Sequence, residues 1–499
     1  MKDKIKFIPF VFLIFVTFWL RLVNLGYSDY YGDEIKAMWR PAPGQSTIEY
    51  LYTQRKGPTE FLITYLVKFV DPNYTNEFLL RLPFALAGIL GIYFFYKLVR
   101  LHFGQKIALY ATLLLSVNGI FIGLMRYVQY QSFVILFSML ALYFFSLASL
   151  QERWKIRGIY LGVAAWTASL FSHYDGVLFA PFALYLLWRW YTQNADLPMG
   201  ARLKHLAVPF AFSAIVLAVY FIPYLLSLSE ATSDYWIQRI GGPVETGTEN
   251  RSSIVVFDLY NPILALYLYP VLGVFSLPKI KKTLPVMIWF AIVWVVLEKA
   301  IFDPGTHIYN YLIPAIILIA FGLEVLEEAL IRVVGKFWGQ RANILWLALL
   351  FGSLAAISHL IFVDHTPEYP FEKRRILLWT IGDQNKEYKL WPYGFPYYRR
   401  WEDIRDYVTT TENNGYYYSN EQDEISIFYI PLVYSRRNAG YYIYIRNPQT
   451  FTRRESSEKA FFWRTHYKPV KVFTYNDKVV AEIYNMPSGS LGEILEEGY

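Results

Sequence analysis

Apolar runs separated by short polar segments occupy most of the chain before residue 364. About eleven of these runs approach the roughly 17 to 25 residues that a helix needs to cross a bilayer. Their approximate limits are 7–26, 79–99, 106–123, 131–150, 158–173, 176–191, 206–228, 253–276, 284–299, 308–330 and 343–363. The pattern predicts a polytopic α-helical membrane protein, because a helix satisfies all of its own backbone groups inside lipid.

Two apolar segments carry additional information. The segment GPTEFLITYLVKF at 58–70 is too short to span, so we expect an interfacial or re-entrant helix there. The first run, 7–26, lacks a small-residue cleavage site, and we therefore expect it to remain as a signal anchor.

The basic residues between the runs predict an orientation. If the N-terminus is cytoplasmic, every inner loop contains several Lys or Arg residues, whereas the outer loops after the third, fifth and ninth runs hold one Arg, none and one Lys. The inner loops contain Lys2, Lys4 and Lys6; Lys97, Arg100 and Lys106; Arg153, Lys155 and Arg157; Arg189, Arg202 and Lys204; Lys279, Lys281 and Lys282; and Arg332, Lys336 and Arg341. Because cytoplasmic loops are enriched in these residues, we expect a cytoplasmic N-terminus. We expect the membrane to be a plasma membrane, either a bacterial inner membrane or an archaeal cell membrane.

The composition changes at Asp364. Short β-type runs follow at 415–419 and 441–446, the segment VKVFTYNDKVVAEIY predicts a hairpin around Asn476-Asp477, and 457–466 favours a helix. An odd number of spans places this part outside the cell. We therefore expect a transmembrane domain at 1–363, with a first outer loop at 27–78, and a small extracytoplasmic α+β domain at 364–499.

Composition agrees with this architecture. Charged residues make up 17% of the chain, against about a quarter in soluble domains. The 43 Tyr and 15 Trp suit both membrane interfaces and stacking on sugar faces. The absence of Cys excludes disulfides and thiolate metal sites. The net charge of +7 is explained by the inner loops, so no nucleic-acid partner is expected.

Ionisable residues near the apolar runs gather at the predicted outer ends rather than near the midplane. They are Arg21, Asp33, Glu34, Arg55, Lys56, Arg81, Arg126, His173, Asp175, Glu298 and His307. An ion-coupled transporter is expected to place such groups near the bilayer centre. The distribution therefore favours chemistry at the outer interface, where the head group of a lipid carrier would lie.

The first outer loop, YSDYYGDEIKAMWR at 27–40, contains the acidic pair Asp33-Glu34. Acidic residues at this position are typical of a helix N-terminus, which is the structural interpretation. The functional interpretation is a general base. Sugar transfer from a phosphate carrier needs a base for the acceptor hydroxyl, cations for the departing phosphate, and in-line alignment. Asp33 can supply the first, and Lys56, Arg81 and Arg126 can supply the second.

Each candidate also has a structural alternative. Arg81 can snorkel from a helix end, Lys56 can belong to a solvated loop, and Arg126 lies in LMRYVQYQS between aromatic residues. The histidines of FSHYDG and PGTHIYNY, His173 and His307, are often interfacial or hydrogen-bonded core residues. Their spacing matches no recognised metal motif, so no metal site is expected.

Two stretches resemble a known family. LRLVNLGYSDYYGDE, followed by NEFLLRLPFALAGILGIYFFYKLVRLHFGQKIALYATLLLSVNGIFIGLMRYVQYQSF, is similar to the protein O-mannosyltransferases and their bacterial relatives, including the aminoarabinose transferase of lipid A. All of these belong to the C-type glycosyltransferase superfamily. The resemblance covers roughly 7–330 and is strongest over 18–150. It rests on an ordered set: the Arg-Leu ending the first run, the Asp-Glu loop, the Arg-Leu-Pro opening the second run, and the Phe-Gly turn after it.

The resemblance implies a catalytic Asp at Asp33, with Glu34 in a supporting role, and a dolichyl- or polyprenyl-phosphate sugar donor. It also implies that donor and acceptor meet near the later outer segments. The substrate-binding candidates are Tyr130, His173, Tyr174, Asp175, His307 and Tyr309. One feature departs from the family pattern. Many relatives carry a second acidic residue shortly after the Arg that matches Arg126, but here Gln129 and Gln131 follow, and Tyr130 fits a variant with Tyr.

These features predict an inverting glycosyltransferase that moves a sugar from a polyprenyl-phosphate carrier to a hydroxyl of a protein, lipid or glycan on the outer face. No cofactor is expected, and the partners are the lipid-linked sugar, the bilayer and the acceptor. A lipid-linked glycan flippase or other transporter, a polysaccharide ligase or polymerase, and a non-enzymatic membrane scaffold are the alternatives. A transporter would be expected to show inverted repeats or charges inside the spans, and neither is apparent in the sequence. A ligase or polymerase would share the donor lipid but not the early Asp-Glu loop. A scaffold would give no reason for charges to gather at one membrane face.

Overall fold

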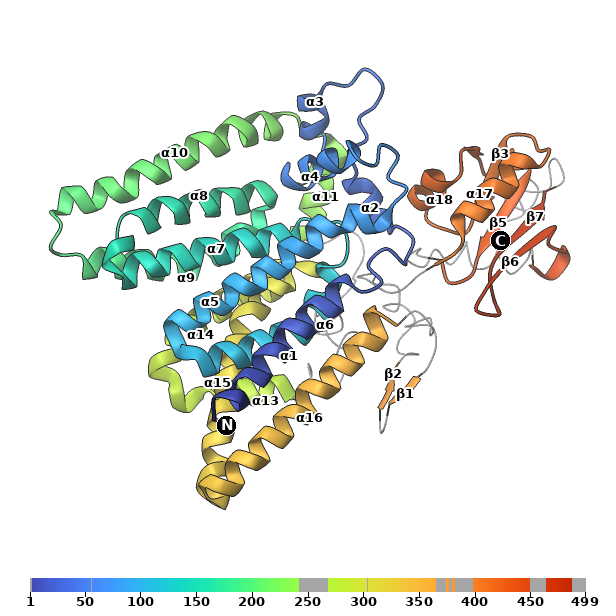
Figure 1. The fold of residues 1–499 in the computed structure, drawn as a ribbon. Helices are drawn as coiled ribbons and strands as arrows, with labels where there is room; N and C mark the ends of the chain where they lie inside the picture. Colours follow the sequence, from blue (N-terminus) through green and yellow to red (C-terminus); the bar gives the residue numbers. More distant parts are fainter. Residues whose placement is uncertain are drawn as a thin grey trace. The chain divides into compact units, whose positions relative to one another are not determined.

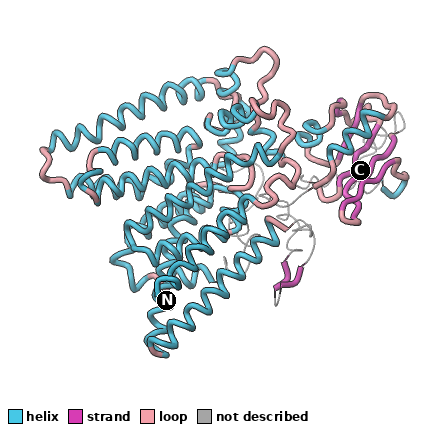
Figure 2. Tube along the Cα trace, viewed as in Figure 1, coloured by secondary structure: helices cyan, strands magenta, loops and turns pink. Residues whose placement is uncertain are grey.

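The computed structural model describes residues 2–54, 56–241, 268–302, 304–364, 374–376, 379–381, 398–448 and 464–486. The chain divides into two compact units. The first comprises Met1–Val23, Trp39–Pro72 and Arg81–His359, and the second comprises Asn24–Met38, Asn73–Leu80 and Leu360–Tyr499. The described part of the first unit is helical, whereas the strands belong to the second (Figures 1 and 2).

The helices of the first unit are joined mostly by short connections (Figure 1). They are α1 (Lys2–Leu22), α3 (Thr47–Tyr52), α4 (Thr59–Lys68), α5 (Glu77–Val117, whose first turn lies in the second unit), α6 (Gly119–Leu124), α7 (Gln131–Leu150), α8 (Arg157–Ser172), α9 (Ala180–Gln193), α10 (Met199–Leu226), α11 (Glu230–Gly241), α13 (Tyr269–Val274), α14 (Ile280–Val295), α15 (Tyr309–Val334) and α16 (Lys336–Phe362). The 3-10 turns η2 (Tyr174–Phe179) and η6 (Gly305–Ile308) precede α9 and α15.

Five described helices are long and apolar enough to cross a membrane: α5, α7, α10, the continuous segment Tyr269–Ala300, and α16. They confirm a multi-pass membrane protein. The run predicted at 79–99 and most of the run predicted at 106–123 form α5, which breaks at Gly104, where φ is 86°. The end of the second run forms the short helix α6. Most of the run predicted at 253–276 lies outside the described residues. The short helix predicted at 58–70 is α4, whose ten residues extend only about 15 Å.

Helix packing brings distant segments of the first unit together. α7 packs along both α8 and α9, α10 packs on α8, and α14 packs against α9 and α15. The turn η2 contacts α7, α8, α9 and α15, which places the connection between α8 and α9 beside the start of α15. Two indole groups hold this turn, because Trp166 donates to the Gly176 carbonyl (2.7 Å) and Trp289 to the Leu178 carbonyl (3.1 Å).

The second unit contains a five-stranded sheet in the order β4-β3-β5-β7-β6. The strands are β3 (Tyr416–Ser419), β4 (Val433–Tyr434), β5 (Tyr441–Ile445), β6 (Lys471–Tyr475) and β7 (Lys478–Asn485), and the helices are α2 (Gly32–Ala37), α17 (Trp401–Thr410) and α18 (Asp423–Tyr429). β3 is parallel to β4 and β5, while β5–β7 and β6–β7 are antiparallel. A further antiparallel pair joins β1 (Arg374–Ile376) and β2 (Trp379–Ile381).

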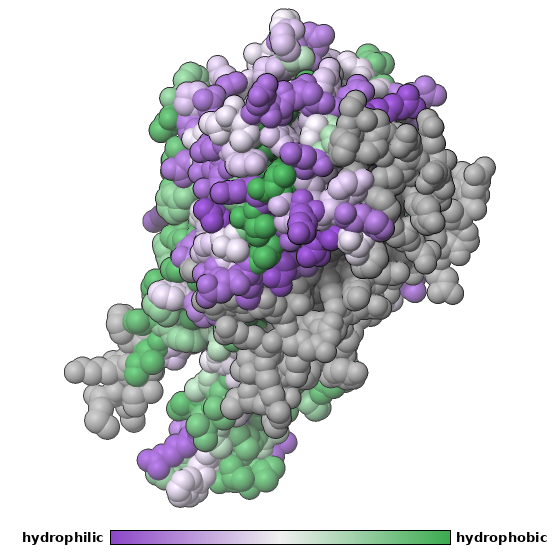
Figure 3. Space-filling model, turned by 90° about the vertical axis from the view of Figure 1, so that its right-hand side faces the viewer, coloured by the Kyte–Doolittle hydropathy of each residue, from purple (hydrophilic) through white to green (hydrophobic). Residues whose placement is uncertain are grey.

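The strands predicted at 415–419 and 441–446 and the hairpin at Asn476-Asp477 are confirmed. Both turn residues have positive φ, 48° and 60°, as a type I′ hairpin turn requires. Tyr418, Tyr442 and Tyr484 are buried and form part of one hydrophobic cluster on the sheet. In the space-filling view from this side, hydrophilic residues predominate in the upper coloured region, around a small hydrophobic strip (Figure 3). The helix predicted at 457–466 lies mostly outside the described residues.

Candidate functional site

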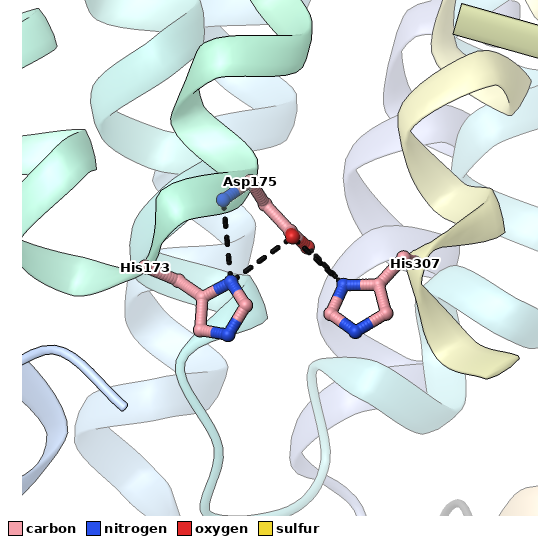
Figure 4. A group of neighbouring side chains, drawn as sticks. All are labelled: His173, Asp175 and His307. Atoms are coloured by element: carbon pink, nitrogen blue, oxygen red, sulfur yellow. Dashed lines mark hydrogen bonds and ion pairs between the residues drawn. The ribbon is translucent and has the colours of Figure 1, made fainter. Parts of the chain in front are cut away.

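A buried acid–histidine cluster lies where η2 meets η6. Asp175 is 1% exposed, and its carboxylate oxygens lie 2.7 and 2.8 Å from Nδ1 of His307 (Figure 4). Nδ1 of His173 lies 3.0 Å from Oδ1 of Asp175 and 3.2 Å from its backbone nitrogen. One carboxylate therefore joins two histidines that are 134 positions apart in the chain.

Two further side chains complete the surroundings of Asp175. The Tyr309 hydroxyl donates to Oδ2 (2.8 Å), and the Asn310 amide donates to the same oxygen (3.3 Å). Burial alone would raise the pKa of Asp175, in the connection between α8 and α9, but the two histidines outweigh this effect and hold that pKa well below its usual range. Asp175 therefore provides a buried negative charge that orients both imidazole rings.

Aromatic rings stack beside the cluster. The ring of Tyr130 lies parallel to that of His173, with ring centroids 3.7 Å apart. The ring of Tyr174 contacts the same imidazole, with ring centroids 3.6 Å apart. Tyr174 is 41% exposed and also packs edge-on against Trp236, on α11, at 4.9 Å. Aromatic faces of this kind are suited to contact with the apolar faces of a sugar ring.

Lys56 supplies a cation next to these rings. Its Nζ lies 5.4 Å from the centroid of the Tyr130 ring and 3.3 Å from Oε1 of Glu60, in the first turn of α4. Glu60 is fully buried. Gly57 allows this approach, since a Cβ at that position would overlap the backbone carbonyl of Phe171 near the end of α8. The Lys-Gly-Pro turn is thus held against the segment that carries His173.

The same cluster is able to hold a divalent cation. His173, Asp175 and His307 each offer one ligand atom, and these atoms lie within 4.8 Å of one another. Imidazole nitrogen and carboxylate oxygen are ligands that Zn²⁺ accepts. Sequence spacing did not reveal this grouping, because the third ligand comes from a different connection. The expectation that no metal is required stays a prediction.

Arg81 and Arg126 lie elsewhere in the first unit and are buried. Nη1 of Arg126 donates to the carbonyls of Leu20 (3.0 Å) and Val23 (2.9 Å), which satisfies the C-terminal end of α1. Arg126 interacts electrostatically with both Arg21 and Arg81. The three neighbouring guanidinium groups create a positive region in an otherwise apolar helical unit, and Arg126 also has a structural role.

Asp33 and Glu34 lie in the second unit, in the first turn of α2, and their side chains differ in role. Oε2 of Glu34 accepts a hydrogen bond from the Tyr31 backbone nitrogen (2.9 Å), so Glu34 occupies the N3 position of a capping box. Glu34 is 1% exposed, whereas Asp33 is half-buried. The capping role considered for the acidic pair therefore belongs to Glu34.

The structure brings together most of the candidates in the first unit. They are Lys56, Tyr130, His173, Tyr174, Asp175, His307 and Tyr309. Sequence reasoning missed Glu60, Asn310 and Trp236 as neighbours of these residues. Asn310 is part of the HIYNY segment, which was the available signal, whereas nothing local distinguishes Glu60 from other first-turn acids of helices.

Comparisons with known proteins agree with this architecture. Residues 60–226 match the family model of dolichyl-phosphate-mannose-protein mannosyltransferases. Two structures of ArnT from Cupriavidus metallidurans are similar over 97% of this chain and 98% of theirs: the apo form has 12% identity and a TM-score of 0.50, and the form bound to undecaprenyl phosphate has 13% and 0.51. A third structure is that of the oligosaccharyltransferase AglB from Archaeoglobus fulgidus, in complex with an inhibitory peptide and a dolichol-phosphate. The match has 12% identity and a TM-score of 0.49, and it covers 89% of this chain and 70% of AglB. No curated protein matches the chain.

The family match and the ArnT-like fold confirm the resemblance found in the sequence. Residues 60–226 are thus similar to a family of membrane mannosyltransferases, and the fold of the chain is similar to that of ArnT.

Proposed function

We propose that this protein transfers a sugar from a polyprenyl-phosphate donor to a hydroxyl of a protein, lipid or glycan on the outer face of a plasma membrane. The observation that carries the proposal is the polar cluster around Asp175 beside a stack of aromatic rings and Lys56. Such a group is costly among apolar helices and is typical of a functional site. The family description names a dolichyl-phosphate sugar, and one ArnT structure contains undecaprenyl phosphate, which supports a polyprenyl-phosphate carrier here.

The reaction breaks the bond between the anomeric carbon and the phosphate oxygen, and forms a bond from that carbon to the acceptor oxygen. Asp33 accepts the proton of the attacking hydroxyl, and the carrier leaves as polyprenyl phosphate. Attack opposite the leaving group inverts the anomeric configuration. No oxidant, reductant or nucleotide is consumed, so we propose that no cofactor takes part.

Lys56, Arg81 and Arg126 are the cations that we assign to the phosphate. Their positive charge offsets the negative charge that grows on the leaving group. The mutual interaction of Arg126 with Arg21 and Arg81 supports this role, because neighbouring cations attract an anion. Tyr130, His173, Tyr174, Asp175, His307 and Tyr309 are assigned to substrate binding, through ring stacking and hydrogen bonds. Glu34 supports the base by capping its helix.

The topology of the protein is part of the same proposal. Eleven spans, a cytoplasmic N-terminus, a transmembrane domain at 1–363 and an outer α+β domain at 364–499 place the first loop, 27–78, on the outer face. This orientation puts Asp33 and the connections that carry Asp175 and His307 on the side where a flipped lipid-linked sugar is presented. It also separates the site from cytosolic nucleotide sugars.

The test is a donor panel. Purified protein in detergent or liposomes is incubated with labelled polyprenyl-phosphate monosaccharides, and release of free polyprenyl phosphate is measured with and without candidate acceptors. We expect release from one class of sugar, with Asp33→Asn as the inactive control. Movement of intact donor across the bilayer without release would instead support a flippase.

A further inference from the structure

The helix that carries Asp33 is short and depends on tertiary contacts. α2 has six residues, and isolated helices of fewer than about 12 residues are marginal in water. Within the second unit, α2 packs against α18, which lies almost 400 positions later in the chain (Figure 1). The position of Asp33 is therefore determined by residues of the C-terminal part.

The two residues Asp29 and Tyr30, just before α2, are fixed by hydrogen bonds to the C-terminal part of the chain. The backbone nitrogen of Arg399 donates to Oδ2 of Asp29 (2.6 Å), and the backbone nitrogen of Tyr30 donates to the Tyr429 hydroxyl (2.8 Å). The ring of Tyr30 also packs edge-on against Phe428 at 5.6 Å. Asp29 and Tyr30 are buried, so these bonds are shielded from competing water.

The helix itself is held at both ends. Gly32, its first residue, lies against the Gln422 side chain, and a Cβ there would overlap the Gln422 amide. Gln422 precedes the first turn of α18 as its N-cap residue. In the last turn of α2, Nζ of Lys36 pairs with Oε1 of Glu424 (3.0 Å), although both side chains are nearly half-exposed. Asp33 lies between the two contacts.

We propose that the segment from Gln422 to Tyr429 is a positioning element for the transfer reaction: it holds α2 so that the Asp33 carboxylate is aligned with the acceptor hydroxyl. This inference rests on the proposed role of Asp33 as the base. Proton transfer requires hydrogen-bond distance, and a displacement of about 1 Å from remote changes costs on the order of a hundredfold in rate. Gln422, Glu424 and Tyr429 act through α2 and have no assigned contact with substrate.

The decisive experiment replaces Gly32 with larger residues, which crowd the Gln422 side chain, and then shortens Gln422 to make room. Gly32→Ala displaces only the flexible end of Gln422, so we expect a small loss of kcat. Gly32→Leu should separate α2 from α18 and lower kcat by about tenfold to a hundredfold, with KM for the donor unchanged. Adding Gln422→Ala to Gly32→Leu makes room for the larger side chain and should restore most of kcat. The matched control is Gly200→Leu in α10, where a Cβ meets nothing within 4 Å.

A second variant tests the same element without adding bulk. Tyr429→Phe removes the hydroxyl that accepts from the buried Tyr30 backbone nitrogen, and should lower kcat and the melting temperature while donor KM stays close to the parent value. Wild-type kcat in both Gly32→Leu and Tyr429→Phe, or a loss in Gly32→Leu that Gln422→Ala does not relieve, would overturn the positioning role. If Asp33→Asn is inactive while these variants are fully active, only this inference fails. If Asp33→Asn is fully active, the proposed base fails as well.

Discussion

At the scale of single residues, the acidic pair of the first outer loop divides into two roles. Glu34 is buried and accepts from the backbone nitrogen of Tyr31, whereas Asp33, its neighbour, makes no contribution to that capping box. Adjacent side chains on a helix point about 100° apart, so the two carboxylates face different surroundings. This division leaves Asp33 as the candidate base.

Asp33→Asn should fold normally and bind donor but lose about a hundredfold to ten-thousandfold in transfer rate, because the amide cannot accept the proton. Glu34→Gln keeps an acceptor for the Tyr31 nitrogen and should retain nearly full activity. Transfer rates and melting temperatures of the two purified variants provide the measurement. Full activity in Asp33→Asn would remove Asp33 from the mechanism.

Arg126 combines a structural contact with the proposed phosphate contact. Arg126→Lys keeps the positive charge but loses the planar guanidinium group. We therefore expect its catalytic rate to lie between those of Arg126→Ala and the parent protein. The loss of one charge-assisted phosphate contact should cost about 2 to 4 kcal/mol in transition-state stabilisation. Donor turnover by Arg126→Lys and Arg126→Ala checks this, with melting temperature recorded because the carbonyls of Leu20 and Val23 lose a donor. Normal turnover by Arg126→Ala would make the residue purely structural.

At the scale of elements, the connection between α8 and α9 is tied to the start of α15 through one carboxylate. Asp175 binds His307, Tyr309 and Asn310, all from η6 or the first turn of α15. The two elements belong to different pairs of helices, and the tie fixes their spacing. The aromatic stack of Tyr130 and Tyr174 on His173 depends on the same arrangement.

Asp175→Asn should weaken this tie, because the neutral amide accepts fewer and weaker hydrogen bonds than the carboxylate. We expect a destabilisation of about 1 to 3 kcal/mol, seen as a lower melting temperature, together with reduced transfer. Asp406→Asn is a suitable control, since Asp406 pairs with Arg405 on an exposed surface and its loss should leave the melting temperature unchanged. Equal melting temperatures for both variants would contradict the structural importance of Asp175.

At the scale of the whole molecule, the proposed orientation in the membrane rests on the basic loops alone. The native chain has no Cys, so single cysteines report cleanly. Asp406→Cys, at an exposed position of α17, should react with an impermeant thiol reagent in intact cells. Ala195→Cys, exposed in a predicted inner loop, should react only after lysis. The reverse labelling pattern would overturn the proposed topology.

The sequence by itself determined the features that depend on local pattern. The lengths of the apolar runs predicted a multi-pass membrane protein, since the bilayer thickness imposes a minimum length. Alternation and the Asn476-Asp477 turn predicted the β6–β7 hairpin, because few residues adopt positive φ readily. The ordered motifs between residues 18 and 150 predicted a resemblance to the mannosyltransferases, and residues 60–226 match the model of that family.

Only the tertiary structure decided which residues meet. His307 lies 132 positions from Asp175, and Gln422 lies 390 positions from Gly32, and no local signal predicts either contact. Such contacts depend on how packed helices and turns fill space, which involves the whole chain at once. The same reason explains why the sequence left open which of the neighbouring acids Asp33 and Glu34 has the capping role: their difference lies in what each side chain reaches after folding.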